Sequence, residues 1–248
     1  MKNMIKFEFR KLFRHISFYV LMGVCLLWTV LNGLMLTVAA MLIPEIGVPS
    51  TVYDFTRSAV STNSMIFVGI FLAIFVVEDF ANGSIKNVVS KGYNNTTVYF
   101  SKYIVSLVAA VMMCLASIIS GVLYGLIFFR EAGSFDSVGY VIPGILLSII
   151  AYHAMFFLIC ISVRKMAPAV VLTIVGPMGL DLVLSLVGIF TQDRFEFNIS
   201  NYWLSGILTN FGSGADTKIY LVELILLVVY LAAFVLAGYF INRDREIK

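Results

Sequence analysis

Six stretches of this 248-residue chain are apolar over about the length that an α-helix needs to cross a bilayer. A spanning helix needs about 20 apolar residues. Stretches of that kind lie at roughly 17–42, 59–77, 98–129, 140–163, 168–190 and 218–241. The sequence therefore predicts an all-α polytopic membrane protein, with six transmembrane helices in one transmembrane domain that covers 1–248.

The composition excludes the main classes of water-soluble protein. Hydrophobic residues make up 60% of the chain and charged residues 12%, whereas a soluble domain is about 45–50% apolar and about 25% charged. The sequence has no GxxxxGK[ST], HExxH, GxSxG or CxxC motif. We therefore expect no catalytic residue, metal site or bound cofactor in this chain, and any ATP hydrolysis belongs to another subunit.

Lysine and arginine are distributed unequally between the two sides of the predicted helices, which indicates the orientation. The richer side carries Lys2, Lys6, Arg10, Lys11, Arg14, Lys86, Lys91, Lys102, Arg164, Lys165, Arg243, Arg245 and Lys248. The poorer side carries Arg57, Arg130, Arg194 and Lys218. This pattern predicts that both termini are cytoplasmic. The anionic inner leaflet accounts for the basic side, so no nucleic-acid partner is implied.

The first sixteen residues have the pattern of an amphipathic helix that lies in the membrane interface. The basic face is formed by Lys2, Lys6, Arg10 and Arg14, and the opposite apolar face by Ile5, Phe9, Leu12, Phe13 and Ile16. A topology anchor is one interpretation of this segment. Its polar face is also available to dock a cytoplasmic partner.

The loop at 78–97 is the most informative polar segment. Gly83 breaks the chain after the second predicted span, Ser84 is a suitable N-cap, and Gly92 suits a helix C-terminus. Between them, Ile85, Val88 and Val89 recur at helical spacing. We expect a short cytoplasmic helix whose apolar face is exposed to the membrane surface or to another protein. Glu78 is expected to hold this loop to the N-terminal helix at Arg10 or Arg14.

The predicted external segment 191–217 is too short in its apolar part to span the bilayer. Its aromatic residues favour an interfacial or re-entrant arrangement, with Tyr202 and Trp203 at headgroup level. Asp181 lies near the middle of the fifth span, where an ionisable group is costly and indicates either substrate contact or a packed, hydrogen-bonded carboxyl. Glu223 is explained by snorkelling to the external interface, and His153 by packing.

The order of these parts resembles an ABC transporter permease of the type-2 exporter branch, in the bacterial peptide-exporter and bacteriocin-immunity subgroup. The run from Lys6 to Phe13 is similar to that family's interfacial elbow helix, here with Glu8, Arg10 and Arg14 as candidate residues. The segment 191–217 resembles its external half-helices. The run from Glu78 to Lys102 looks like its coupling loop, with the candidate residues Glu78, Asp79, Gly83, Ser84, Ile85, Lys86, Val88, Val89 and Gly92.

The resemblance implies a multi-pass subunit of the bacterial cytoplasmic membrane that pairs with a second permease chain, identical or different. A separate ABC ATPase would bind ATP and Mg²⁺ and drive the export of amphipathic or antimicrobial peptides or similar hydrophobic substrates. Phenol-soluble modulin exporters are one such kind. Two alternatives stay open: an ion-coupled secondary transporter that uses Asp181 and His153, and a non-transporting membrane sensor or scaffold.

Overall fold

The computed structural model describes residues 1–42, 51–129, 131–133, 138–195, 198–213 and 217–244. Regular structure within these ranges is helical throughout, with no strand. Six helices are long and apolar enough to cross a membrane. They are α2 (Ile16–Leu42), α4 (Thr62–Ala81), α6 (Asn95–Phe128), α7 (Val138–Val163), α8 (Met166–Phe195) and α10 (Thr217–Asp244). The predicted all-α architecture with six candidate spanning helices is confirmed.

Two span boundaries differ from the sequence prediction for a physical reason. α4 continues to Ala81 and so includes Glu78 and Asp79, which the apolar pattern alone assigned to the following loop. α6 begins at Asn95, and Asn94 caps it by accepting a hydrogen bond from the Thr96 amide at 3.3 Å. An asparagine side chain satisfies one of the amides that a helix start leaves unpaired.

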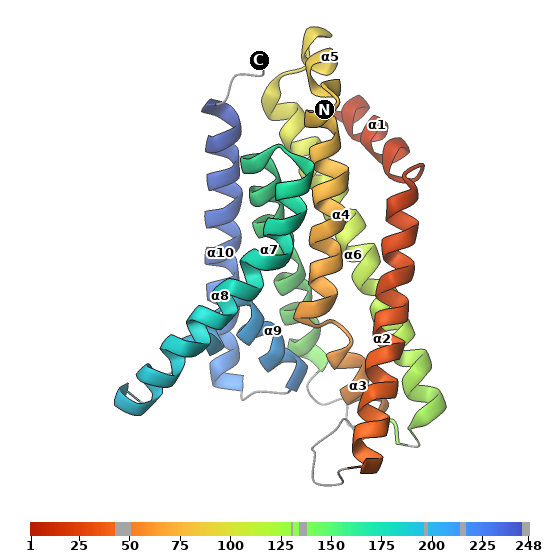
Figure 1. Cartoon of the computed structure of the whole chain (residues 1–248), viewed down its shortest axis with the longest axis vertical. Helices are drawn as coiled ribbons and strands as arrows, with labels where there is room; N and C mark the ends of the chain where they lie inside the picture. Colours follow the sequence, from red (N-terminus) through yellow and green to blue (C-terminus); the bar gives the residue numbers. More distant parts are fainter. Residues whose placement is uncertain (43–50, 130, 134–137, 196–197, 214–216, 245–248) are drawn as a thin grey trace.

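The long helices form a bundle with α7 near its centre (Figure 1). α7 packs against α10, α4, α6 and α9. On one side α2 packs against α6 and α4, and on the other α8 contacts α4 and then diverges from the bundle toward its far end (Figure 1). Two short helical segments, η1 (Ile199–Tyr202) and α9 (Leu204–Ser213), lie beside this end of α8 and contact α8 and α7, respectively.

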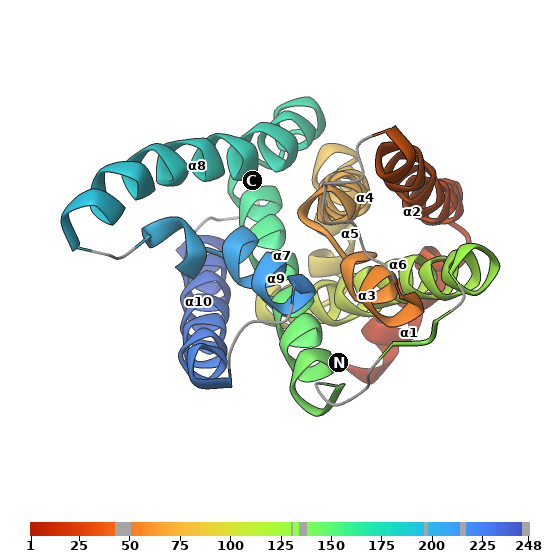
Figure 2. The ribbon, with the colours of Figure 1, turned by 90° about the horizontal axis from the view of Figure 1, so that it is seen from below.

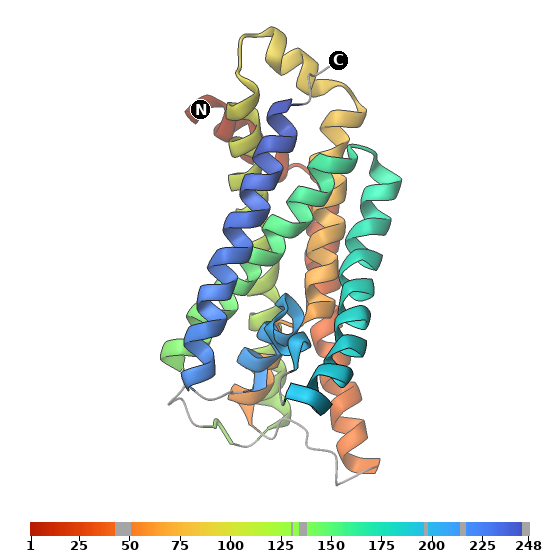
Figure 3. The same cartoon turned by 90° about the vertical axis from the view of Figure 1, so that its left-hand side faces the viewer.

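The N-terminus, the end of α10 and the short helix α5 (Ser84–Ser90) lie at the same end of the bundle (Figure 3). The helix α1 (Lys2–Leu12) also lies there and packs against α6. The turn between α7 and α8 is at this end too, with Arg164 in a left-handed conformation at φ 53°. Three residues of the charge pattern, Arg130, Arg245 and Lys248, lie outside the described residues.

The opposite end carries three short segments, α3 (Val52–Ser58), the 3-10 helix η1 (Ile199–Tyr202) and α9 (Leu204–Ser213). Seen from this end, α3 covers α6 and α9 covers α7 (Figure 2). α3 was not predicted. It approaches α6 closely because Gly121 and Gly125 have no side chain, and an added Cβ would lie 2.9 Å from Ala59 Cβ and 3.0 Å from Val52 Cγ1.

α9 buries an apolar face in the bundle. Its buried side chains are Leu204, Ile207, Leu208 and Phe211. Trp203, which precedes it, packs edge-on against Tyr230 of α10 at 5.4 Å between ring centroids. Trp203 and Phe211 of the segment 191–217 therefore pack within the bundle. Residues 196–197 and 214–216 of this segment lie outside the described part of the chain.

The charge pattern predicts which end faces the cytoplasm, and cysteine labelling tests it. Ser90→Cys is exposed at the α5 end and Ala132→Cys at the opposite end, while the native Cys25, Cys114 and Cys160 are buried. In intact cells, a membrane-impermeant maleimide is expected to label Ala132→Cys alone. Labelling of Ser90→Cys before the cells are permeabilised would reverse the orientation.

Candidate functional site

Charged side chains gather where α1, the end of α4 and the start of α6 meet. The cluster consists of Glu8 and Lys11 of α1, His15 of the turn that follows, Glu78 and Asp79 of α4, and Lys102 of α6. These residues are separated by up to 94 positions in the chain. The fold therefore assembles this site from three helices.

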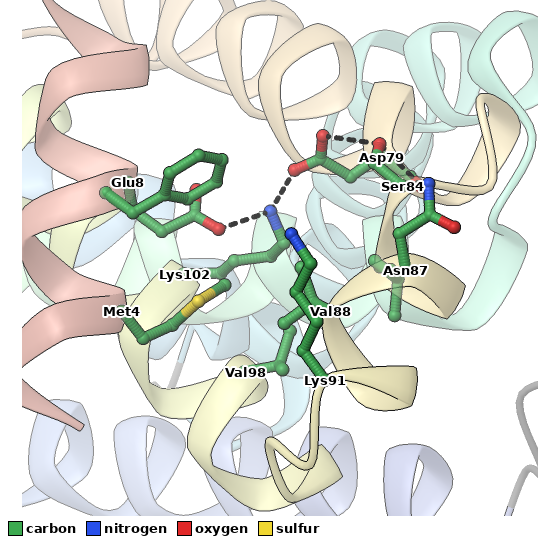
Figure 4. A pocket seen from close by; sticks show the side chains of 11 residues that line it. Met4, Glu8, Asp79, Ser84, Asn87, Val88, Lys91, Val98 and Lys102 are labelled. Atoms are coloured by element: carbon green, nitrogen blue, oxygen red, sulfur yellow. Dashed lines mark hydrogen bonds and ion pairs between the residues drawn. The ribbon is translucent and has the colours of Figure 1, made fainter.

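Lys102 is the centre of the charge cluster (Figure 4). Its side chain is 2% exposed, and its ammonium donates to Glu8 Oε1 at 3.0 Å and to Asp79 Oδ2. A buried ammonium loses its hydration at a cost of several kcal/mol, which only well-placed opposite charges offset. Two carboxylates from two different helices supply that compensation, so Lys102 ties α1 and α4 to α6.

The rim of the cluster is more exposed. Lys11 Nζ lies 2.6 Å from Asp79 Oδ1 and 3.5 Å from Glu78 Oε2, and His15 Nε2 lies 3.0 Å from the same Glu78 oxygen. Because each carboxylate of α4 contacts more than one partner, the end of α4 is held to the α1–α2 corner by several contacts.

Glu78 does hold this region to α1, but the predicted partners are wrong. Arg10 and Arg14 are exposed, and among the described residues no ion pair joins either of them to Glu78. The residues of α1 that face the bundle are Met4, Glu8 and Leu12, spaced by four. Lys11 is next to that buried face, whereas Arg10 points away from it.

The predicted apolar face of the first helix is confirmed in part: Leu12 is buried, and Ile5 and Phe9 pack against the core. Phe13 and Ile16 are exposed, at 48% and 78%, and the buried stripe includes a carboxylate, Glu8. Helical periodicity of apolar residues does not reveal such a face, because its charged member is compensated from a distant helix. A usable signal was present in α6: Lys102 lies inside the apolar stretch 98–129, where a charge needs a partner.

α5 is tied to the same cluster. Gly83 precedes it in a left-handed conformation at φ 66°, and Gly92 follows it at φ 87°, so both positions favour glycine. Ser84 Oγ donates to Asp79 Oδ1 at 3.2 Å. Ser84 is the first residue of the helix and Gly83 holds the cap position, one residue before the predicted cap.

The predicted exposure of the apolar stripe on α5 is wrong for one residue. Ile85 is 4% exposed, while Val88 and Val89 are half-buried. The exposed side chains of this segment are those of Asn87, Ser90 and Lys91. Lys86 was predicted as part of the site, and its side chain lies outside what the structure describes. Ile85 is buried because residues of α1 lie opposite it.

A cavity of about 180 Å³ lies between α1, α5 and α6 (Figure 4). Ile85 and Val88 line it from α5, and Met4 and Phe7 face them from α1. The charged groups Glu8, Asp79, Lys91 and Lys102 also line it. The site is therefore an amphipathic cavity with a buried ion-pair cluster in its wall.

At the other end of the bundle, two acids predicted within the spans both contact α9. Ser205 Oγ donates to Asp181 Oδ1 at 2.7 Å, and Asn210 Nδ2 donates to Glu223 Oε1 at 2.5 Å. Glu223 is fully buried, so the expected snorkelling to the external interface is wrong. The contacts favour the packing interpretation of Asp181. His153 is also packed, with Nε2 2.9 Å from Ser106 Oγ.

The two interpretations of Asp181 predict different outcomes for two substitutions. Asp181→Asn retains an oxygen that accepts from Ser205, so a packing role predicts unchanged transport, and Asp181→Leu is expected to lose it. Contact with a cationic substrate predicts loss in both variants, because both lack the charge. Transport assays on membranes with equal amounts of each variant distinguish the two roles.

Comparison with known families covers this site. The family model described as "ABC-2 family transporter protein" matches residues 4–179, more than two thirds of the chain. The matched region includes most of α1, all of α5 and every member of the charge cluster, and ends just before Asp181. No curated protein and no solved structure gives a match. The chain therefore belongs to the ABC-2 family of transporter membrane proteins.

Proposed function

We propose that this permease is the membrane half of an exporter driven by a separate ABC ATPase, and that α5 is the surface on which the ATPase docks. One observation carries the proposal: Asp79 contacts Ser84 of α5, Lys11 of α1 and Lys102 of α6. A displacement of α5 would thus be transmitted to the interfacial helix and to two spanning helices together.

The exposure of α5 supports the docking role. Ile85 faces the cavity, whereas Asn87, Ser90 and Lys91 remain exposed at the end of the molecule. Val89 is half-buried and does not line the cavity. The docking surface we propose therefore comprises Asn87, Val89, Ser90 and Lys91, with Gly83 and Gly92 as the positions about which α5 moves.

The remaining parts of the proposal rest on the sequence resemblance. The substrates are amphipathic or antimicrobial peptides or similar hydrophobic molecules. A second permease chain, identical or different, completes the pathway in the bacterial cytoplasmic membrane. The α5 end is cytoplasmic, as the distribution of lysine and arginine predicts, and the ATPase supplies the ATP and Mg²⁺ site. Asp181 stays a candidate for the substrate pathway, either by direct contact with a substrate or through its hydrogen bond with Ser205 of α9.

The docking role predicts that Val89→Arg with Ser90→Arg releases the ATPase. Arginine is compatible with a helix C-terminus, so α5 stays formed while bulk and charge block the surface. We expect co-purification of the ATPase and peptide export to fall at least tenfold, with the permease amount in the membrane unchanged. Ala132→Arg, exposed at the opposite end, is the control and is expected to have no effect.

Retention of the ATPase by the double variant, with hydrolysis still stimulated by substrate, would show that α5 is only a connector. The substrate class has its own measurement in the same preparation. An amphipathic peptide is expected to stimulate ATP hydrolysis, and a peptide of the same composition with its residues reordered to remove the apolar face is not. Equal stimulation by both peptides contradicts the proposed substrate.

A further inference from the structure

The turn between α7 and α8 contains Arg164, which at φ 53° is the one residue other than glycine with a positive φ in the described part of the chain. Glycine adopts this left-handed conformation freely, whereas a residue with a Cβ is disfavoured in it. Asparagine and aspartate also occur there, because their short polar side chains bond to the nearby backbone. Arginine has neither advantage, which indicates that its guanidinium has a role at this position.

The guanidinium contacts three helices. It lies over the Phe80 ring of α4, with Cζ 4.8 Å from the ring centroid, in the arrangement of a cation–π interaction. Nη2 donates to Asn242 Oδ1 of α10 at 3.4 Å, and Nε donates to the Ile161 carbonyl of α7 at 3.3 Å. α8 begins two residues after Arg164, at Met166. Arg164 therefore links the beginning of α8 to α4, α7 and α10.

Asn242 extends these contacts to α6. It is buried, and its backbone carbonyl accepts from Asn95 Nδ2 at 3.3 Å. In the chain, Phe80 lies shortly before α5, and Asn95, the first residue of α6, lies shortly after it. Both ends of the α5 connection thus reach one group of contacts. We call this group the Arg164 junction, formed by Phe80, Asn95, Arg164 and Asn242.

The junction reaches helices that the charge cluster does not. Asp79 and Phe80 are neighbours at the end of α4, but Asp79 pairs with Lys11 of α1 and Lys102 of α6, whereas Phe80 contacts Arg164. Among the described residues, the charge cluster has no member on α8 or α10. A displacement at the end of α4 is therefore passed to α8 and α10 by Phe80 and Arg164.

We propose that Arg164 is a positioning residue that transmits displacement of the α5 connection to α8 and α10. The proposal rests on the coupling role proposed for α5 and adds the contact through which motion reaches the C-terminal helices. α8 is suited to respond, because it contacts α4 and α7 and then diverges from the bundle (Figure 1). In its middle, an added Cβ at Gly176 or Gly179 meets nothing within 4 Å.

Arg164→Gly tests the role of the side chain, because glycine keeps the turn and removes only the guanidinium. Spin labels at Ile127→Cys of α6 and Phe190→Cys of α8, both exposed, report the distance between these helices at the end opposite α5. Labelled chain is diluted with unlabelled chain in the complex with its ATPase, with and without vanadate-trapped nucleotide. Trapping is expected to shift the distance in the parent protein, and Arg164→Gly is expected to lose that shift.

The same variant is expected to retain the ATPase and its hydrolysis, while peptide export per ATP hydrolysed falls about tenfold, within the usual range of coupling between sites. Arg164→Asn is the second variant, since asparagine tolerates a positive φ and is too short to replace the guanidinium contacts. It is expected to lose the shift as well. Lys165→Ala removes an exposed lysine from the same turn and is expected to change nothing.

An unchanged shift in the two Arg164 variants overturns the proposal, because the turn alone would then be sufficient. Release of the ATPase by these variants also overturns it, since Arg164 would then act in docking rather than in transmission. Failure of the docking role is a separate result. It is seen as retention of the ATPase by Val89→Arg with Ser90→Arg, whereas the Arg164 variants are compared with the ATPase bound.

Discussion

Replacing Lys102 with methionine is expected to destabilise the protein strongly and to abolish export. Methionine has a similar length and no charge, so the packing volume is largely retained. Glu8 and Asp79 are left without the cation that lies between them. Removing one partner of a buried ion pair costs about 3–5 kcal/mol. Thermal unfolding in detergent, followed by loss of the monodisperse species, measures the change, and an export assay measures the function.

Lys6→Met is the matched control, since it removes an exposed lysine from the same end of the bundle. A second comparison isolates the ion pair itself. Glu8→Gln in the Lys102→Met background removes one of the stranded carboxylates, so the double variant is expected to be more stable than Lys102→Met alone. Such non-additivity is the signature of direct contact. If Lys102→Met unfolds at the temperature of the parent protein, the cluster does not hold α1 in place.

Gly206→Ala is expected to displace η1 from α9 and to reduce export severely. A Cβ at this position would lie 2.2 Å from the Ser200 carbonyl oxygen and 2.7 Å from Asn201 Cα. Both are backbone atoms, so no side-chain rotation relieves the clash and the segment itself must move. Overpacking of a core costs about 1–3 kcal/mol even where side chains adjust. The thermal unfolding temperature and the export rate are both expected to fall.

Gly176→Ala and Gly179→Ala provide the comparison, because an added Cβ at either position meets nothing within 4 Å. Both lie in the middle of a spanning helix, where alanine is favoured over glycine. They are expected to leave export and stability unchanged or slightly improved. A similar effect of all three substitutions would contradict the assignment of the Gly206 effect to the close approach of η1.

The long helices could be predicted from the sequence because their signal is local. Twenty or more consecutive apolar residues leave few alternatives in a membrane protein, and the predicted stretches overlap all six long helices. The turn glycines Gly83 and Gly92 were also identifiable, since each borders the short helical pattern of α5. These features depend on neighbouring residues alone.

The contacts of the site could not be predicted in the same way. Glu8 is buried because it pairs with Lys102, which is 94 positions away in the chain. A local sequence pattern does not reveal a contact over that separation. Ile85 was expected to be exposed, but α1 forms the opposite wall of the cavity that it lines. α3 has only seven residues, too few for a periodic signal. In each case the deciding partner lies on a different helix.

The two hydrogen bonds that hold α9 have a consequence for motion at the α9 end of the bundle. Asp181 on α8 accepts a hydrogen bond from Ser205 of α9, and Glu223 on α10 accepts one from Asn210 of the same helix. If α8 separates from α10 and α9 stays with only one of them, the carboxylate on the other helix loses its hydrogen-bond donor. Leaving a carboxylate inside the protein without a partner is costly. The segments of α8, α9 and α10 that these bonds join are therefore expected to move together rather than separately.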